Sequence, residues 1–243
     1  SQFKACFAEY NFHLSLLKNI SIFKQTLKGK VRDGFESPTT LAPCTLAVTH
    51  IDILNMTTEL NIFLKSFVDL TEKELLCITS LFTVKKVKKG KFLLKAGQIC
   101  KDLIFVKTGC IRMFYLSAET EVSAWFSLNN SLAIEVQSFI SQSPSICFLQ
   151  AIEDSEIYIL PKVKLEDLYL TQPKTQELMR KIWEAALVAV IPRFSSLQND
   201  TAEKRYLDLL QNPELMRQIP QKYLASFIGV TPTSLSRIRK KIR

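Results

Sequence analysis

Hydrophobic and polar residues follow different periods in successive parts of the chain. From Leu60 to about Phe82 the apolar positions recur every three or four residues, which is typical of amphipathic helix, with Asp69 or Thr71 as an N-cap. From Val84 the apolar runs are short, aromatic or β-branched, and separated by turn signals. These runs are KFLLKAG, DLIFVKTG, IRMFYLS, VSAWFSL, ICFLQAI and SEIYILP. We therefore predict an α+β protein with an antiparallel β-roll.

Beyond Pro161 the pattern is helical again, with one short helix and then a long one from about Lys174. Four apolar residues of the long helix are spaced by four, three and four positions and would form one seam. They are Leu178, Ile182, Ala185 and Ala189. We expect this seam to join two copies of the chain in a homodimer. Packing of the same residues against the chain's own β-roll is the alternative, and Pro192 favours a kink near the helix end.

The segment from Ile219 to Lys241 predicts two short helices around a tight turn. The first, from about Gln221 to Ile228, carries its apolar residues on one face, and Gly229 follows where the chain needs a left-handed residue. The second begins with Thr231 as N-cap and Pro232 at the first helical position, where a missing N–H costs nothing. This arrangement is typical of a helix-turn-helix whose second helix reads the major groove of DNA.

The outward face of the second helix supplies the candidate DNA contacts. Arg237 is long enough for bidentate contact with guanine, worth roughly 1–3 kcal/mol of discrimination, and lies on one face with Thr233. The further candidate contacts, to bases or to the DNA backbone, are Thr231, Ser234, Ser236, Arg239, Lys240 and Lys241. An ordinary helical hairpin with a solvated basic face is the alternative.

The charge of the chain is concentrated in the same region. The formal net charge is +9 and the pI is about 9.2. From Thr201 onward the chain carries nine basic and three acidic residues, a net +6 of the total +9. A localised excess of this kind is expected where a protein contacts phosphates.

Cysteines, histidines and hydropathy exclude several kinds of site. The cysteines at positions 6, 44, 77, 100, 110 and 147 show no CxxC spacing, so we expect free thiols in a cytoplasmic protein. His13 and His50 are the chain's two histidines, so neither a Ser-His-Asp triad nor a His-ligated metal is expected in the main body. No apolar run approaches the ~18 residues needed to span a bilayer, so no membrane partner is expected.

The first 55 residues have no clear period and no convincing helix caps. Met56 then opens a stretch that looks like a natural N-terminus. Our hypothesis is that residues 1–55 are an extension outside the folded unit, and outside the expressed protein as well. One or two extra N-terminal helices are the alternative.

Five motifs carry a resemblance to a known family. They are KGKFLLKAGQ from Lys89, FVKTG from Phe105, QAIEDSE from Gln150, AEKRY from Ala202 and IPQKYLASFIGVTPTSLSRIRK from Ile219. The chain from about Leu60 to Ile242 resembles the Crp/Fnr transcription regulators, and most closely the divergent branch common in Bacteroidetes. The resemblance implies a β-roll sensor domain at 56–172, a dimerisation helix at 173–199 and a helix-turn-helix DNA-binding domain at 200–243. It further implies a regulator without catalytic activity whose partners are palindromic duplex DNA, a second copy and RNA polymerase.

The family's cyclic-nucleotide pocket uses a Gly-Glu pair, whose Glu bonds the ribose, and an Arg that pairs with the cyclic phosphate. Here Glu135 matches the Glu, but Ile134 replaces the Gly and Ser145 stands where the Arg is expected. No arginine lies between Arg112 and Arg180, and a buried phosphate without a cationic partner is costly. We therefore predict no binding of cyclic AMP in the family manner and no required cofactor. Another, apolar effector and a β-roll without a ligand are both left open.

The family reads bases at helix positions that fall here on Pro232, Thr233 and Arg237. Because Pro232 lacks the side chain for such a contact, the operator sequence does not transfer. A ligand-binding or scaffold protein with a vestigial helix-turn-helix is one alternative function. A cupin-type enzyme is another, but it needs metal ligands on the strands, and 56–243 contains no histidine.

Overall fold

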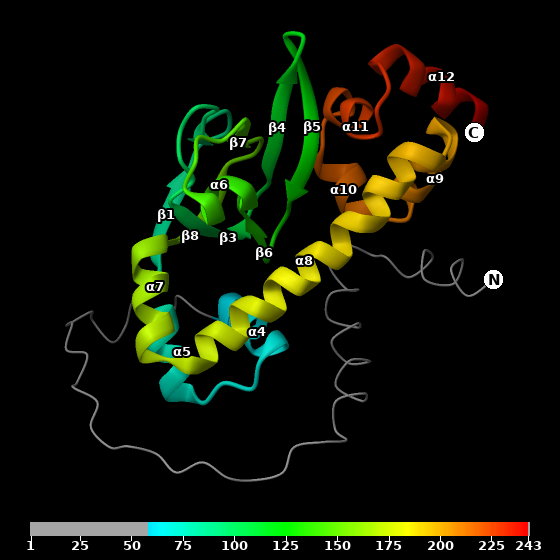
Figure 1. Cartoon of the computed structure of the whole chain (residues 1–243). Helices are drawn as coiled ribbons and strands as arrows, with labels where there is room; N and C mark the ends of the chain where they lie inside the picture. Colours follow the sequence, from blue (N-terminus) through cyan, green and yellow to red (C-terminus); the bar gives the residue numbers. More distant parts are fainter. Residues whose placement is uncertain (1–57, 243) are drawn as a thin grey trace. The chain divides into compact units, whose positions relative to one another are not determined.

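The computed structural model describes residues 58–242, so the hypothesis about residues 1–55 lies outside the described range. In chain order, two short helices precede a β-roll, which is followed by a short helix, the long helix α8 (Pro173–Asn199) and four short helices that end in red in Figure 1. This order agrees with the predicted α+β architecture, which is confirmed.

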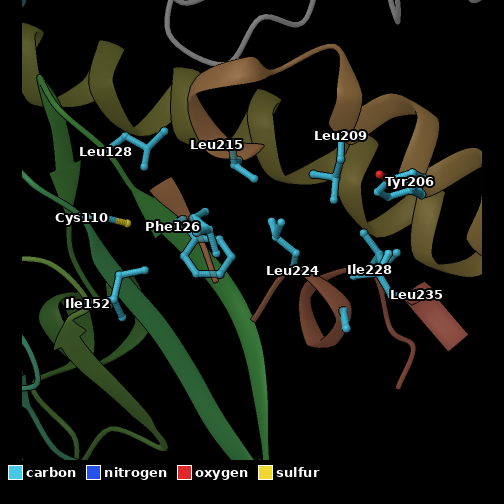
Figure 2. Close-up of a cluster of buried hydrophobic side chains, with 12 residues drawn as sticks. Cys110, Phe126, Leu128, Ile152, Tyr206, Leu209, Leu215, Leu224, Ile228 and Leu235 are labelled. Carbon is cyan, nitrogen blue, oxygen red and sulfur yellow. The ribbon is translucent and has the colours of Figure 1, made fainter. Parts of the chain in front are cut away.

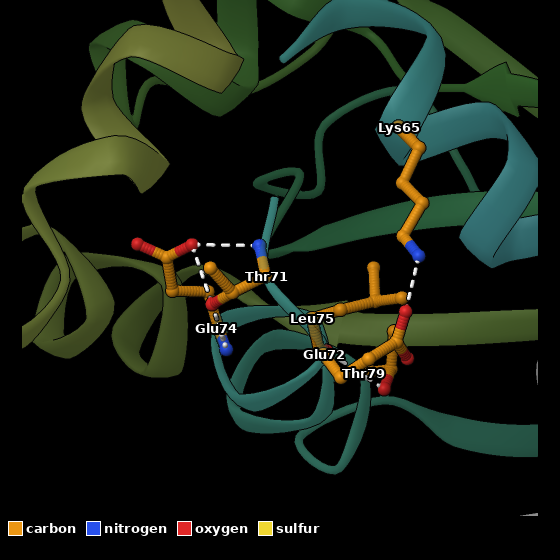
Figure 3. A network of polar contacts seen from close by, with 6 residues as sticks. All are labelled: Lys65, Thr71, Glu72, Glu74, Leu75 and Thr79. Atoms are coloured by element: carbon orange, nitrogen blue, oxygen red, sulfur yellow. Dashed lines mark hydrogen bonds and ion pairs between the residues drawn. The ribbon is translucent and has the colours of Figure 1, made fainter. Parts of the chain in front are cut away.

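The helical start consists of α4 (Thr58–Phe67) and α5 (Glu72–Thr79), within the helical pattern predicted from Leu60 to about Phe82. A capping box begins α5 (Figure 3). The Thr71 hydroxyl accepts from the Glu74 N–H at 3.3 Å, and the Glu74 carboxylate accepts from the Thr71 N–H at 2.8 Å. Thr71 is therefore the cap. The Glu74 carboxylate accepts from the Thr71 N–H, from the Thr71 hydroxyl and from Lys174, and these three hydrogen bonds lower its pKa below the usual value.

Two four-stranded antiparallel sheets form the β-roll. Their orders are β1-β8-β3-β6 and β2-β7-β4-β5. The strands are β1 (Thr83–Val87), β2 (Phe92–Leu94), β3 (Asp102–Thr108), β4 (Ile111–Ser117), β5 (Thr120–Ser127), β6 (Ser131–Ala133), β7 (Cys147–Ala151) and β8 (Ser155–Pro161). The six predicted runs become strands. The strands β1 and β6 were not predicted, because β1 is a lysine-rich, largely exposed edge strand and β6 has only three residues.

Gly109 forms the tight connection between β3 and β4. Its φ of +104° lies in the region that favours glycine, and a Cβ added there would lie 2.2 Å from the Ser155 Oγ of β8. The glycine therefore serves both the backbone turn and the close approach of a neighbouring strand.

Helices follow the roll to the end of the described chain. They are α7 (Lys162–Thr171), α8 (Pro173–Asn199), α9 (Ala202–Leu210), α10 (Pro213–Gln218), α11 (Gln221–Phe227) and α12 (Pro232–Ile242), and α6 (Val136–Ser141) lies within the roll. Thr201 caps α9, since its side chain accepts from the Lys204 N–H. Pro192 lies inside α8, and the helix continues past it to Asn199.

One apolar cluster joins the β-roll to the last helices, as Figure 2 shows. Phe126 of β5 and its neighbours meet the buried faces of α9, α10 and α11, and the Phe126 and Phe227 rings lie 5.2 Å apart. The buried members are Cys110, Phe126, Leu128, Ile152, Tyr206, Leu209, Leu215, Ile219, Leu224, Ala225, Ile228 and Leu235. The helix-turn-helix is therefore packed on the roll rather than tethered to it.

Candidate nucleic-acid interface

The corner between α11 and α12 has the backbone geometry of a Schellman motif. Gly229 adopts φ +71°, its N–H donates to the Ser226 carbonyl at 3.1 Å, and the Val230 N–H donates to the Ala225 carbonyl at 2.9 Å. Ala225 is fully buried in the apolar cluster, so a larger side chain there would have to displace its neighbours. The corner therefore ends α11 and fixes the direction in which α12 begins.

Two arginines from other helices hold the carbonyl end of α11. Arg193 of α8 donates to the Phe227 carbonyl at 2.7 Å and stacks on the Phe227 ring at 3.3 Å from its centroid. Arg205 of α9 donates to the Ile228 carbonyl at 2.8 Å. Burial, together with the neighbouring Arg205, lowers the pKa of Arg193 to about 10. Cations are favoured at this helix end, because the last carbonyls carry partial negative charge.

Helix α12 begins as the sequence predicts. Thr231 accepts from the Ser234 N–H at 3.2 Å, and Pro232 is the first helical residue. Leu235 is buried and Ile238 is half-buried against the cluster. The α12 residues Thr233, Ser236, Arg237 and Lys240 are all exposed, and their helical spacing places them on one face.

The remaining candidate DNA contacts are partly engaged within the protein. Thr231 and Ser234 hydrogen-bond each other through their hydroxyls at 3.0 Å, and Ser234 and Arg239 are half-buried. Lys241 forms an ion pair with Glu203 of α9 at 2.7 Å. The structure therefore brings four of the candidate DNA contacts together on the exposed face of α12. The other four candidates are half-buried or bonded to residues of the protein itself.

Both candidate ligand residues of the roll are used by the roll's own backbone. Glu135, only 7% exposed, is the N-cap of α6, where its carboxylate accepts from the N–H groups of Gln137 and Ser138. The Ser145 hydroxyl accepts from the Cys147 N–H at 2.9 Å. A phosphate placed at this helix end would meet a carboxylate, so the arrangement opposes an anionic ligand.

The predicted dimer seam needs correction. Leu178 and Ile182 are 1% and 5% exposed within a single copy, so the chain itself already covers them. Ala185 and Ala189 are half-buried. The periodicity identified the apolar face of α8, but its first half is already covered by the same chain.

A different row of apolar residues on α8 is exposed in the single chain. Its members are Leu187, Val188, Val190, Ile191, Phe194 and Leu197. Leu187 also lines an open groove of about 530 Å³ beside α7, together with Tyr169 and Trp183. Residues 187, 190, 194 and 197 recur every three or four positions, which is typical of a helix–helix seam.

The possible metal ligands and the thiols within 58–242 form no cluster. No group of three or more His, Cys, Asp or Glu side chains there could hold a metal ion. Cys100, Cys110 and Cys147 are free thiols. Burial raises the pKa of Cys147 to about 11, which disfavours its reactive thiolate. No helix in this range is long and apolar enough to cross a membrane.

The comparisons with known proteins match the β-roll first and then the whole order of elements. Residues 84–172 match the family model of the cyclic nucleotide-binding domain. No curated protein matches the sequence.

Solved structures extend the likeness beyond that domain. FixK2 from Bradyrhizobium japonicum shares 16% identity at a TM-score of 0.57, over 66% of this chain and 84% of its own. The c-di-GMP-responsive global regulator CLP of Xanthomonas campestris shares 14% identity at a TM-score of 0.58, over 71% of this chain and 91% of its own. A protein from Eubacterium rectale assigned to the Crp/Fnr family of transcriptional regulators shares 17% identity at a TM-score of 0.56, over 72% of this chain and 84% of its own.

The fold is therefore that of the solved Crp/Fnr regulators, which confirms the resemblance stated from the sequence at the level of the fold. The placement in a Bacteroidetes branch stays a prediction. Sequence reasoning missed Arg193 and Arg205, which support the corner, and Arg112 and Ser226, which are described below. The available signal for Arg112 was a charged residue inside the apolar run IRMFYLS.

Proposed function

We propose that this protein is a sequence-specific DNA-binding transcription regulator of the Crp/Fnr type, acting in the cytoplasm as a homodimer. The observation that carries the proposal is the free face of α12, where Thr233, Ser236, Arg237 and Lys240 lie together beyond a rigid corner. A helix of this kind enters a major groove, where arginine reads guanine and lysine neutralises phosphate. RNA polymerase stays an expected partner.

The homodimer rests on the second half of α8. The row from Leu187 to Leu197 exposes apolar side chains that a second α8 would cover, and two such helices would pack in a coiled-coil manner. A dimer would present two α12 helices to a palindromic site, because the symmetry of the protein then matches that of the DNA.

The proposal excludes cyclic AMP as effector in the family manner. The roll offers no arginine between Arg112 and Arg180, and the Glu135 carboxylate already occupies the N-terminus of α6. A cyclic phosphate would therefore be buried against a negative charge without a cationic partner. Titration calorimetry of the full chain with cyclic AMP is expected to show no heat of binding; micromolar affinity would contradict this part of the proposal.

Selection of bound fragments from genomic DNA tests the function directly. Fragments recovered by the purified full chain, with and without cell extract, should share a palindromic sequence, and binding should weaken steeply with salt. Failure to bind any duplex in dilute salt would contradict the proposal and leave the vestigial-domain alternative.

Two variants then separate base reading from backbone contact on the selected site. Arg237→Ala should reduce the preference for that site over random duplex by roughly 1–3 kcal/mol. Lys240→Ala should weaken binding to all sequences alike and flatten the salt slope by about one unit. Lys91→Ala, which removes an exposed charge from the roll, is the matched control and should leave both quantities unchanged.

A further inference from the structure

A fully buried arginine lies between the β-roll and the helix-turn-helix. Arg112 of β4 is 0% exposed. Its guanidinium carbon is 3.9 Å from the centroid of the Tyr223 ring of α11 and 4.3 Å from that of the Phe114 ring of β4. The cation is therefore in contact with one aromatic ring from the roll and one from the helix-turn-helix.

The polar partners of Arg112 all come from β5. Its Nε donates to the Ser123 hydroxyl at 2.8 Å, and its Nη1 donates to the Glu121 carboxylate at 2.6 Å. Its Nη2 is buried without a hydrogen-bond partner among residues 58–242. A buried cation with one unpaired N–H₂ group and a half-exposed partner carboxylate is a poor source of stability.

A second polar contact lies beside it. The Ser226 hydroxyl of α11 accepts from the Ser123 N–H at 2.8 Å and donates to the Glu121 carbonyl at 3.0 Å. Because β5 is the edge strand of its sheet, these backbone groups face the position where a further strand would pair. Ser226 occupies that position, so α11 is held by β5 at the same two residues that hold Arg112.

We propose that Arg112 is a positioning residue for DNA recognition, an inference that rests on the proposed function. The apolar cluster holds α11 against the roll, but apolar contacts are non-directional. The stacked guanidinium and the Ser226 hydrogen bonds are directional, so they fix the orientation of α11 about its own axis. Since the corner at Gly229 transmits the direction of α11 to α12, Arg112 fixes how α12 is presented to a groove.

The test compares Arg112→Met with wild type in the full chain. Methionine keeps much of the length and fills the site, but removes the charge and the directional contacts. The melting temperature should fall only modestly, because the Glu121 carboxylate that loses its partner is half-exposed and can be hydrated. The ratio of affinities for the selected site and random duplex should fall roughly tenfold, while affinity for random duplex stays within about twofold.

Matched variants separate positioning from a general loss of structure. Tyr223→Phe keeps the ring and should behave as wild type, whereas Tyr223→Leu should reproduce the Arg112→Met loss without adding to it in the double variant. Lys107→Met removes another partly buried ion pair of the roll, that with Glu156, and should leave the affinity ratio unchanged.

The outcomes distinguish this inference from the proposed function. An Arg112→Met protein with the wild-type affinity ratio, or with a ratio that falls only as the melting temperature falls, overturns the positioning role. Absence of specific binding by wild type overturns the proposed function itself.

Discussion

A Cβ atom added at Gly109 would lie 2.2 Å from the Ser155 Oγ and 2.8 Å from the Ser155 Cα, distances that packed atoms do not adopt. Gly90 is the matched comparison, because it also has a positive φ but no atom within 4 Å of such a Cβ. Gly90→Ala should therefore cost only the backbone strain, about 1–2 kcal/mol. Gly109→Ala should cost more in urea unfolding, since β8 must also move. Equal losses would contradict the close approach.

The Glu74 carboxylate gives the protein a defined sensitivity to acid. Its pKa is lowered in the folded state by hydrogen bonds to Thr71 and Lys174, so its contribution to the free energy of unfolding is complete above its ordinary value of 4.5. That contribution is lost as the pH falls through the lower folded pKa. Glu74→Gln keeps an acceptor for the capping box but cannot titrate.

Urea unfolding of wild type and Glu74→Gln at a series of pH values measures this effect. The stability advantage of wild type over the variant should shrink below pH 4.5 and be constant near neutral pH. A constant difference across the whole range would show that Glu74 does not stabilise the fold through its charge.

At the scale of elements, the exposed row on α8 predicts the oligomeric state. Phe194→Asp would place a charge in the apolar dimer contact, so sedimentation equilibrium should show monomers, with the helix content unchanged. Leu170→Asp on α7 is the control, since Leu170 is also an exposed apolar residue but lies outside the row. If the Phe194→Asp variant still formed dimers, the dimer interface would lie outside this row of α8.

Local signals explain why the corner of the helix-turn-helix could be read from the sequence. Gly229, Thr231 and Pro232 act within a few residues of themselves, through a left-handed backbone, a cap and a fixed φ. The same holds for Thr71 at the start of α5 and for the runs that became strands. Such residues determine where elements begin and end, without reference to the rest of the fold.

Contacts between distant parts of the chain were not readable in this way. Ser226 and Ser123 are 103 positions apart, and no periodicity connects them. The same limit explains the seam on α8. Apolar residues spaced by three and four positions show that Leu178 and Ile182 share one face of a helix. The spacing does not show whether the protein's own core or a second copy covers that face.

At the scale of the whole molecule, the apolar cluster that joins Phe126 to α9, α10 and α11 couples the stability of the β-roll to that of the last helices. Unfolding of 58–242 should be a single transition, with ellipticity and the fluorescence of Trp125 on β5 and Trp183 on α8 changing at the same urea concentration. Two separated transitions would show that the roll and the last helices fold independently.

The same cluster limits what can be done by cutting and joining this chain. A helix-turn-helix excised from it would bring Leu224 and Ile228 into water, and a roll left behind would uncover Phe126 and Leu128. Fusing these last helices to the sensor of another regulator would therefore give an aggregating hybrid, unless the recipient supplied an equivalent apolar surface. Reprogramming the protein should proceed by exchanging side chains on α12 in place.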